Sequence, residues 1–166
     1  MKALALSLLV VATAFNLRAE DSKILGSWKS DRETTLKFME ENAKIPEERL
    51  NALKPMFGKS TFTFQKGGKG TVVTEAYEIP MKGGKTIKVP ASVQPFTYKI
   101  LGETKKQVVT RVTYPETGEL PELIKMLNES PFAITVFPDR NNCWTYISNG
   151  FVDLHAREYF VRVKTE

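Results

Sequence analysis

Hydrophobic and polar residues alternate along most of the chain after residue 60, with the period of two that is typical of β-strands with one buried face. Phe62 and Phe64, for example, are separated by a threonine. The alternation returns in residues 70–77, 86–89, 96–100, 107–114, 132–136, 143–148 and 157–163. Short turns separate many of these segments, with Lys-Gly-Gly-Lys at 66–69 and 82–85 and Asn-Gly at 149–150. Such turns favour tight hairpins, so the pattern predicts consecutive antiparallel strands.

Residues 31–58 follow a helical pattern instead. Asp31 is suited to cap a first helix, in which Leu36 and Met39 recur at helical spacing. Pro46 is suited to the first turn of a second helix, which Gly58 would end. The apolar positions of that helix are Leu50, Leu53 and Phe57. We expect this helical pair to cover a core, and residues 121–128 to add one or two further helical turns.

Consecutive hairpins with one apolar face have to bury that face and protect their edges, and closure into a barrel does both. With a short strand at residues 24–30, the chain offers about eight or nine strands. We therefore predict a mostly β protein, an antiparallel up-and-down barrel of about eight strands with a short helical pair after the first strand. No repeat or linker divides residues 20–166, which we expect to form a single domain.

The first nineteen residues, MKALALSLLVVATAFNLRA, have the pattern of a signal peptide. Lys2 precedes an uncharged run over residues 3–14, which is shorter than the roughly 20 apolar residues that span a bilayer. Cleavage after Ala19 fits best, because Glu20, Asp21 and Ser22 follow it, and cleavage after Ala14 is the alternative. We expect a secreted or periplasmic protein without stable membrane insertion.

Composition excludes several classes of function. The chain carries 24 Lys and Arg and 19 Asp and Glu, a net charge of +5, and loss of Lys2 and Arg18 with the signal peptide leaves 22 − 19 = +3. The lysines are spread over several turns instead of forming a basic stripe, so we expect no nucleic-acid partner. One His and one Cys cannot form a Cys₂His₂, Cys₄ or His₃ zinc site or an internal disulfide. We expect no metal and no cofactor.

Residues suited to catalysis are few. Cys143 and His155 would make a nucleophile and base only if the fold brought them together, and a lone Cys in a strand is more often a small buried hydrophobe. Asp153 and His155 share one face of an extended segment, which is more typical of a loop hydrogen bond. We expect the protein not to be an enzyme.

Two short motifs resemble those of a known family. The start Leu25-Gly26-Ser27-Trp28-Lys29 resembles the Gly-x-Trp opening of lipocalin and wider calycin barrels, and the end Glu158-Tyr159-Phe160-Val161-Arg162-Val163 resembles the last strand of small bacterial lipocalin-like domains. The resemblance implies that Trp28 plugs one end of the barrel and that an arginine lies across its ring. Arg162 is the first candidate for that arginine and Arg157 the second. A guanidinium on an indole is worth about 0.5–1 kcal/mol when exposed.

An eight-stranded barrel either fills with side chains or encloses one small ligand. The alternation offers the interior Phe62, Phe64, Phe96, Tyr98, Ile100, Phe132, Ile134 and Val136, which is enough to fill much of it. A pocket is the alternative, with Tyr77, Tyr98, Tyr114 and Arg111 as polar groups and Met56 and Phe57 at its entrance. We therefore expect a barrel that binds a small apolar or amphipathic ligand. The alternative is a solid barrel that binds an envelope protein, as inhibitors and immunity proteins do, through residues 138–142, the Gly-Lys turns or a strand edge.

Overall fold

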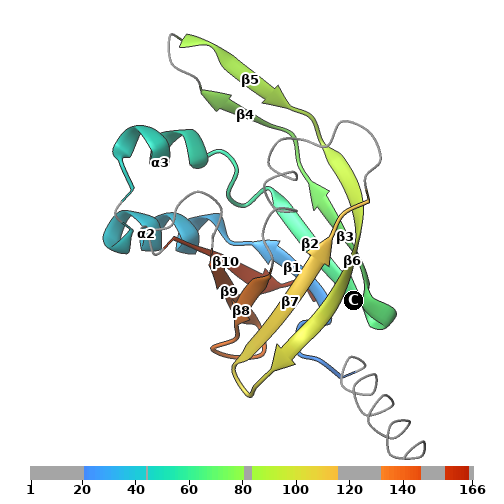
Figure 1. Ribbon diagram of the computed structural model, residues 1–166. Helices are drawn as coiled ribbons and strands as arrows, with labels where there is room; N and C mark the ends of the chain where they lie inside the picture. Colours follow the sequence, from blue (N-terminus) through green and yellow to red (C-terminus); the bar gives the residue numbers. More distant parts are fainter. Residues whose placement is uncertain (1–20, 44, 81–83, 116–131, 147–155, 165–166) are drawn as a thin grey trace, which may run out of the picture.

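The computed structural model describes residues 21–43, 45–80, 84–115, 132–146 and 156–164 (Figure 1). Several expectations from the sequence lie outside these residues. They are the signal peptide over residues 1–19, the helical turns at 121–128, the turn at 149–150, and the side chains of Asp153 and His155.

Eight strands form a closed antiparallel barrel in the order β1-β10-β9-β8-β7-β6-β3-β2. Strand β1 pairs with β2 on one side and with β10 on the other, and these two pairings close the sheet. The predicted fold class is therefore confirmed. The barrel strands are β1 (Gly26–Ser30), β2 (Ser60–Gln65), β3 (Lys69–Thr74), β6 (Ser92–Glu103), β7 (Gln107–Thr113), β8 (Ala133–Val136), β9 (Asn142–Tyr146) and β10 (Arg157–Arg162).

The segment between β3 and β6 leaves the barrel. Strands β4 (Tyr77–Pro80) and β5 (Thr86–Val89) pair only with each other, and this hairpin extends away from the barrel beyond the helices (Figure 1). The sequence predicts one strand over residues 70–77, whereas β3 ends at Thr74. The predicted turn between β2 and β3 is confirmed. It contains the short 3₁₀ turn η1 (Lys66–Gly68), in which Gly67 and Gly68 have φ values of +77° and +74° that favour glycine.

The two predicted helices are present as α2 (Arg32–Asn42) and α3 (Glu47–Leu53), but α3 ends at Leu53 and not at Gly58, so the expected helical position of Phe57 lies in the turn beyond it. Asp31 caps α2, because its Oδ1 accepts a hydrogen bond from the Thr34 amide at 3.1 Å. The start of α2 also completes the sheet where β1 ends. The Asp31 amide donates to the Tyr159 carbonyl at 2.8 Å, and the Tyr159 amide donates to Thr35 Oγ1 at 2.9 Å. Both backbone groups of Tyr159 are thereby satisfied on the side where β1 has ended.

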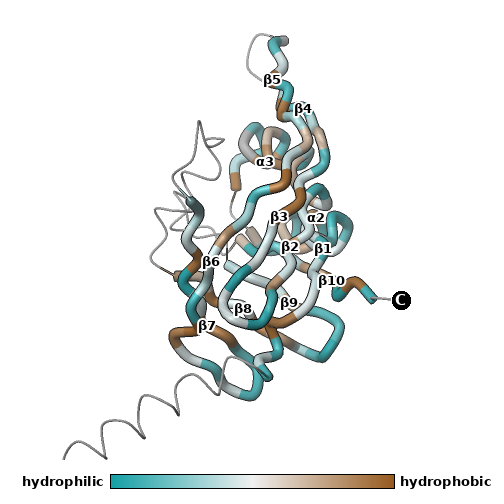
Figure 2. Tube along the Cα trace, turned by 90° about the vertical axis from the view of Figure 1, so that its right-hand side faces the viewer, coloured by the Kyte–Doolittle hydropathy of each residue, from teal (hydrophilic) through white to brown (hydrophobic). Residues whose placement is uncertain are grey.

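Strand register decides which residues face the barrel interior, because paired residues on neighbouring strands share a face. Trp28 pairs with Phe62, and Phe62 pairs with Val72, which places these three side chains inside. The alternation of hydropathy along the strands can be followed in Figure 2. A second cluster of buried residues, Met39, Leu50, Phe57 and Ala156, joins the helices to the start of β10.

The expectation for β8 was wrong. Thr135 pairs with Val108, which is fully buried, so Ala133 and Thr135 face inward while Ile134 and Val136 face outward. Phe132 is 47% exposed, and Phe137 packs in the core instead. Both alternating sets in this segment contain apolar residues, so hydropathy alone does not distinguish its two faces, and the register with β7 decides.

Candidate functional site

One end of the barrel is closed by Trp28, which is 2% exposed. Its indole Nε1 donates to the Ile24 carbonyl at 2.7 Å, and its ring packs edge-on against Phe137 with centroids 5.4 Å apart. The Arg162 guanidinium carbon lies 4.1 Å from the centroid of the Trp28 ring. The structure therefore places the first candidate, Arg162, across the tryptophan.

Arg162 is held by three backbone carbonyls. Its Nη1, Nη2 and Nε donate to the carbonyls of Leu25, Lys23 and Arg140 at 2.8, 2.9 and 2.8 Å. Gly26 allows this close approach, since a Cβ at this position would lie 2.7 Å from Nη1 and the backbone φ is +109°. The contacts among Gly26, Trp28 and Arg162 thus join the first strand of the barrel, β1, to the last strand, β10.

Aromatic rings fill the middle of the barrel. Phe64 lies 5.3 Å from Phe96 and 5.1 Å from Tyr98 between ring centroids, and Phe62 lies 5.8 Å from Phe160 and 6.4 Å from Phe96. The Tyr98 hydroxyl donates to the Gln65 carbonyl at 2.8 Å. These tilted and edge-on contacts are the favourable arrangement of aromatic pairs. The expected filling by Phe62, Phe64 and Phe96 is therefore present in this part of the interior.

Inward-facing side chains become more accessible towards the opposite end, which we call the mouth. In the closed and middle parts most are buried, namely Val72, Phe96, Tyr98, Val108, Thr110, Phe137, Cys143 and Phe160, while Phe62, Phe64 and Ile100 are partly exposed. Near the mouth most are partly exposed and small or polar, namely Ser60, Thr74, Ser92, Gln94, Val112, Ala133, Thr135, Thr145 and Glu158. Burial of the inward-facing side chains therefore tends to decrease from the Trp28 end towards the mouth, where Ser30 and Tyr114 are still buried.

Glu158 places a carboxyl group on the inner wall of the mouth. It lies on β10 on the same face as Phe160, and it pairs with Thr145 of β9. Ser30 Oγ donates to Glu158 Oε1 at 2.6 Å, and the Gly58 amide in turn donates to Ser30 Oγ at 2.9 Å. Burial raises the pKa of Glu158 to about 7, although the Ser30 hydrogen bond acts in the opposite direction.

Glu158 is not among the site residues predicted from the sequence, although the sequence carries a signal for it. Glu158, Phe160 and Arg162 share one face of a strand, and the expected contact of Arg162 with Trp28 already turns that face inward. Arg157 consequently points outward. Its guanidinium carbon lies 4.0 Å from the Trp144 ring centroid and 4.7 Å from that of Phe38.

The predicted ligand-binding residues do not form one group. Tyr114 is buried and faces inward against Phe96 at 5.8 Å, and burial raises its pKa to about 12. The Tyr98 hydroxyl is already bonded to Gln65, which removes the group expected to hold a ligand. Tyr77 lies in β4, outside the barrel sheet. Arg111 is exposed on the outer face, because it pairs with Lys99 and alternates with the buried Thr110.

The predicted entrance residues are split between two environments. Phe57 is buried in the helical cluster with Met39, Leu50 and Ala156, and so packs the helices instead of lining an opening. Met56 is partly exposed in the turn after α3. Gly58, which follows Phe57, reaches the mouth through the hydrogen bond that its amide donates to Ser30 Oγ.

The chemistry of the described residues is sparse. Cys143 is buried at 3% exposure, and burial raises the pKa of its thiol to about 12, as expected for a structural cysteine. No group of three His, Cys, Asp or Glu side chains suited to a metal ion occurs among the residues that the structure describes. Within the same residues, no helix has the length and hydrophobicity needed to cross a membrane.

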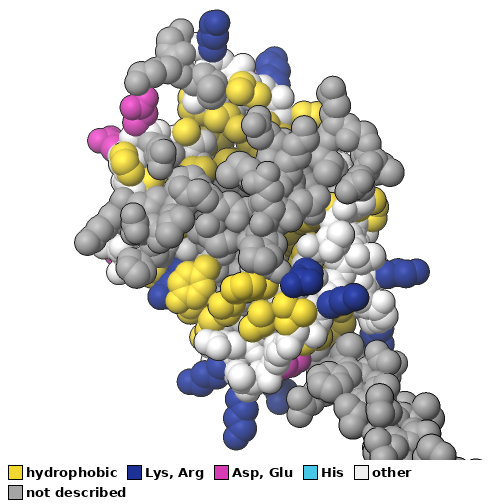
Figure 3. All heavy atoms as spheres, in the orientation of Figure 1, with side chains coloured by type: hydrophobic (Ala, Val, Ile, Leu, Met, Phe, Trp, Pro, Cys, Tyr) yellow, Lys and Arg dark blue, Asp and Glu magenta, His cyan; other side chains and the backbone are white. Residues whose placement is uncertain are grey.

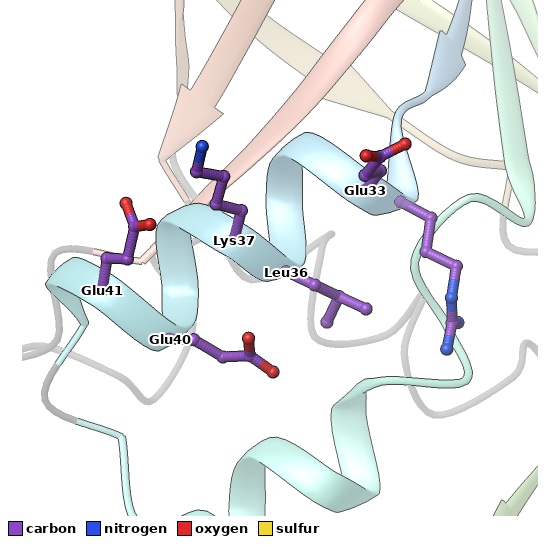
Figure 4. Close-up of a pocket in the computed structure, with 6 residues that line it drawn as sticks. Glu33, Leu36, Lys37, Glu40 and Glu41 are labelled. Carbon is purple, nitrogen blue, oxygen red and sulfur yellow. The ribbon is translucent and has the colours of Figure 1, made fainter.

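The described part of the outer surface has a groove beside α2 and dispersed charges. The groove lies beside α2 and is lined by Arg32, Glu33, Leu36, Lys37, Glu40 and Glu41, whose side chains point to different sides of the helix (Figure 4). Glu40 is paired with Lys54 at 3.0 Å. Lysine and arginine side chains are scattered over the face in Figure 3 and do not form a stripe. The mouth is therefore the better candidate site.

Comparison with family models, curated proteins and solved structures gives no match to this chain. The barrel topology and the geometry of the mouth are thus the grounds for assigning a function.

Proposed function

We propose that the protein is an exported, lipocalin-like barrel that binds one small apolar or amphipathic molecule in its mouth, without catalysis. The observation that carries this proposal is the change in accessibility along the inner wall. Most side chains that point inward are buried towards the Trp28 end, whereas Thr74, Gln94 and Thr135 near the mouth are partly exposed. This difference favours the mouth over the Trp28 end as the place where a ligand binds.

The chemistry of the wall suits such a ligand. The floor consists of Phe62, Phe96 and Phe160, of which Phe62 is partly exposed, while the described part of the wall carries hydroxyl and amide groups and the Glu158 carboxyl. Sites for small molecules typically combine an apolar lining with a few polar groups. The lipocalin-like assignment rests on the Gly26-x-Trp28 opening, the Arg162 stack and the barrel topology. Export rests on the sequence pattern of residues 1–19.

Binding of the neutral fluorescent probe N-phenyl-1-naphthylamine to the mature chain tests the proposal. We expect saturable binding at one site per chain. Thr74→Phe places a large side chain in the mouth and should weaken binding at least about tenfold, since it displaces the ligand volume. Val73→Phe is the matched control, because Val73 precedes Thr74, points outward and is 43% exposed. Absence of saturable binding, or equal losses in both variants, would contradict the proposal.

The β4–β5 hairpin favours a second candidate, a protein-binding module of the cell envelope. Each strand of this hairpin has an edge that no other described strand pairs with, and Ile87 is 48% exposed. Unpaired strand edges are templates for pairing with another chain. Affinity capture from envelope extract with the full mature chain tests this candidate. A partner whose recovery is lost in Ile87→Lys would support it, and recovery of no specific partner would count against it.

A further inference from the structure

We infer that the ligand of the mouth is an amphipathic amine, whose cationic head group binds the Glu158 carboxylate and whose apolar part lies on the aromatic floor. This inference rests on the proposed function and names the chemical class of its ligand. It starts from an arrangement that packing alone leaves unexplained, a carboxyl on the inner wall of a barrel.

The surroundings of Glu158 supply little to balance a negative charge. On one side β1 offers the Ser30 hydroxyl at 2.6 Å, and on the other β9 offers the paired Thr145. Thr145 Oγ1 itself donates to the Ile134 carbonyl at 3.0 Å. Neither strand presents a charged side chain to the carboxyl in the described part of the chain, and Arg157 and Arg111 point to the outer face.

A second inward acid among the described residues, Glu103, shows the contrast. Glu103, at the closed end, forms an ion pair with Lys23 at 3.7 Å and accepts a hydrogen bond from the Lys23 amide. Glu158 has only the one hydroxyl donor among the described residues. A half-buried carboxylate with a single donor is a costly arrangement unless a cation or further donors reach it.

The floor fixes the orientation of the ligand. Phe160 lies two residues deeper than Glu158 on the same face of β10, a distance of about 6.6 Å along an ideal strand. Phe160 packs on Phe62, which is itself only partly buried. A molecule with its ammonium group at Glu158 would therefore place its apolar part against these rings. An anionic head group would instead face the carboxylate.

Octylamine, octanol and octanoate have the same chain length and test the inference through displacement of N-phenyl-1-naphthylamine at pH 8. We expect octylamine to bind at least about tenfold more tightly than octanoate, as two charges in contact at a partly buried site require. Glu158→Gln should remove this preference and leave octanol binding within about twofold. Glu103→Gln is the matched control, since it removes an inward acid at the closed end.

A pH titration of the unsubstituted protein gives an independent measurement. Octylamine affinity should fall as the pH decreases below about 7, where Glu158 takes up a proton while the amine stays charged. Octanol affinity should stay constant over the same range.

The outcomes separate the two proposals. Equal binding of octylamine and octanoate, or a preference that survives Glu158→Gln, would overturn the amine inference and leave a ligand-binding barrel. Failure of the probe and of all three octyl compounds to bind would overturn the proposed function itself.

Discussion

Replacement of Gly26 by alanine would disturb the closed end of the barrel in two separable ways. The backbone φ of +109° is one that side chains other than glycine rarely adopt, and such a conformation costs about 1–3 kcal/mol. The new Cβ would also lie 2.7 Å from Arg162 Nη1 and would displace the guanidinium. Weakening its charge-assisted hydrogen bonds adds about 1–2 kcal/mol. We expect Gly26→Ala to lower the free energy of unfolding by about 2–5 kcal/mol in total.

A double-mutant cycle with Arg162→Met distinguishes the two contributions. Equilibrium unfolding in urea, followed by tryptophan fluorescence, gives the free energy of unfolding for each variant. In the Arg162→Met background the clash is relieved, so Gly26→Ala should cost about 1–2 kcal/mol less than in the unsubstituted protein. Gly67→Ala provides the control for backbone strain, because Gly67 also has a positive φ but no atom lies within 4 Å of a Cβ there.

Equal costs of Gly26→Ala in both backgrounds would refute the reasoning. That result would mean that Gly26 acts through its backbone conformation alone and that Arg162 does not require the missing side chain. A cost of Gly26→Ala equal to that of Gly67→Ala would lead to the same conclusion.

Three further predictions concern single side chains. Thr35→Val should lower the free energy of unfolding by about 1–3 kcal/mol, because it leaves the Tyr159 amide without its acceptor. Thr61→Val, on the outer face of the barrel, is the control and should be nearly neutral in urea unfolding. Cys143 should react with Ellman's reagent only after unfolding, because burial raises its pKa to about 12, and fast labelling of the folded protein would contradict its buried position. The pKa of Glu158 is raised from 4.5 to about 7, so the folded state binds this proton more tightly than the unfolded state. The resulting stability should be present below pH 4.5 and lost as the pH rises through 7, by up to about 2–3 kcal/mol. Urea unfolding at pH 5 and pH 8 should show this loss in the unsubstituted protein relative to Glu158→Gln, and identical pH dependence of the two would exclude it.

Local sequence signals predicted the helix start and the turn well, because each of these features depends on residues that are close together in the chain. Asp31 caps α2 through the amide of Thr34, three residues away, and Gly67 and Gly68 form the turn between two paired strands. The position of Arg162 over Trp28 also agrees with the expectation from the sequence, although the two residues are far apart in the chain. That agreement came from motifs at the two ends of the chain, whose strands pair to close the barrel.

The candidate site was harder to predict, because its residues are defined by the direction in which they point. Arg111, Tyr77 and Tyr98 have suitable chemistry, yet one is on the outer face, one in a separate hairpin and one bonded to Gln65. Glu158 was overlooked because an acidic residue in a strand is usually assigned to the solvent face.

The sequence by itself determined that this chain forms antiparallel strands with one apolar face, that two helices follow the first strand, and that Trp28 and Arg162 belong together. Only the tertiary structure decided that residues 77–89 leave the barrel, that Phe137 and not Phe132 enters the core, and that Glu158 lines the mouth. The physical reason is that alternation with a period of two places every second residue on the same face of a strand. Which face is buried depends on strand register and on closure of the sheet, and both are set by contacts between distant segments.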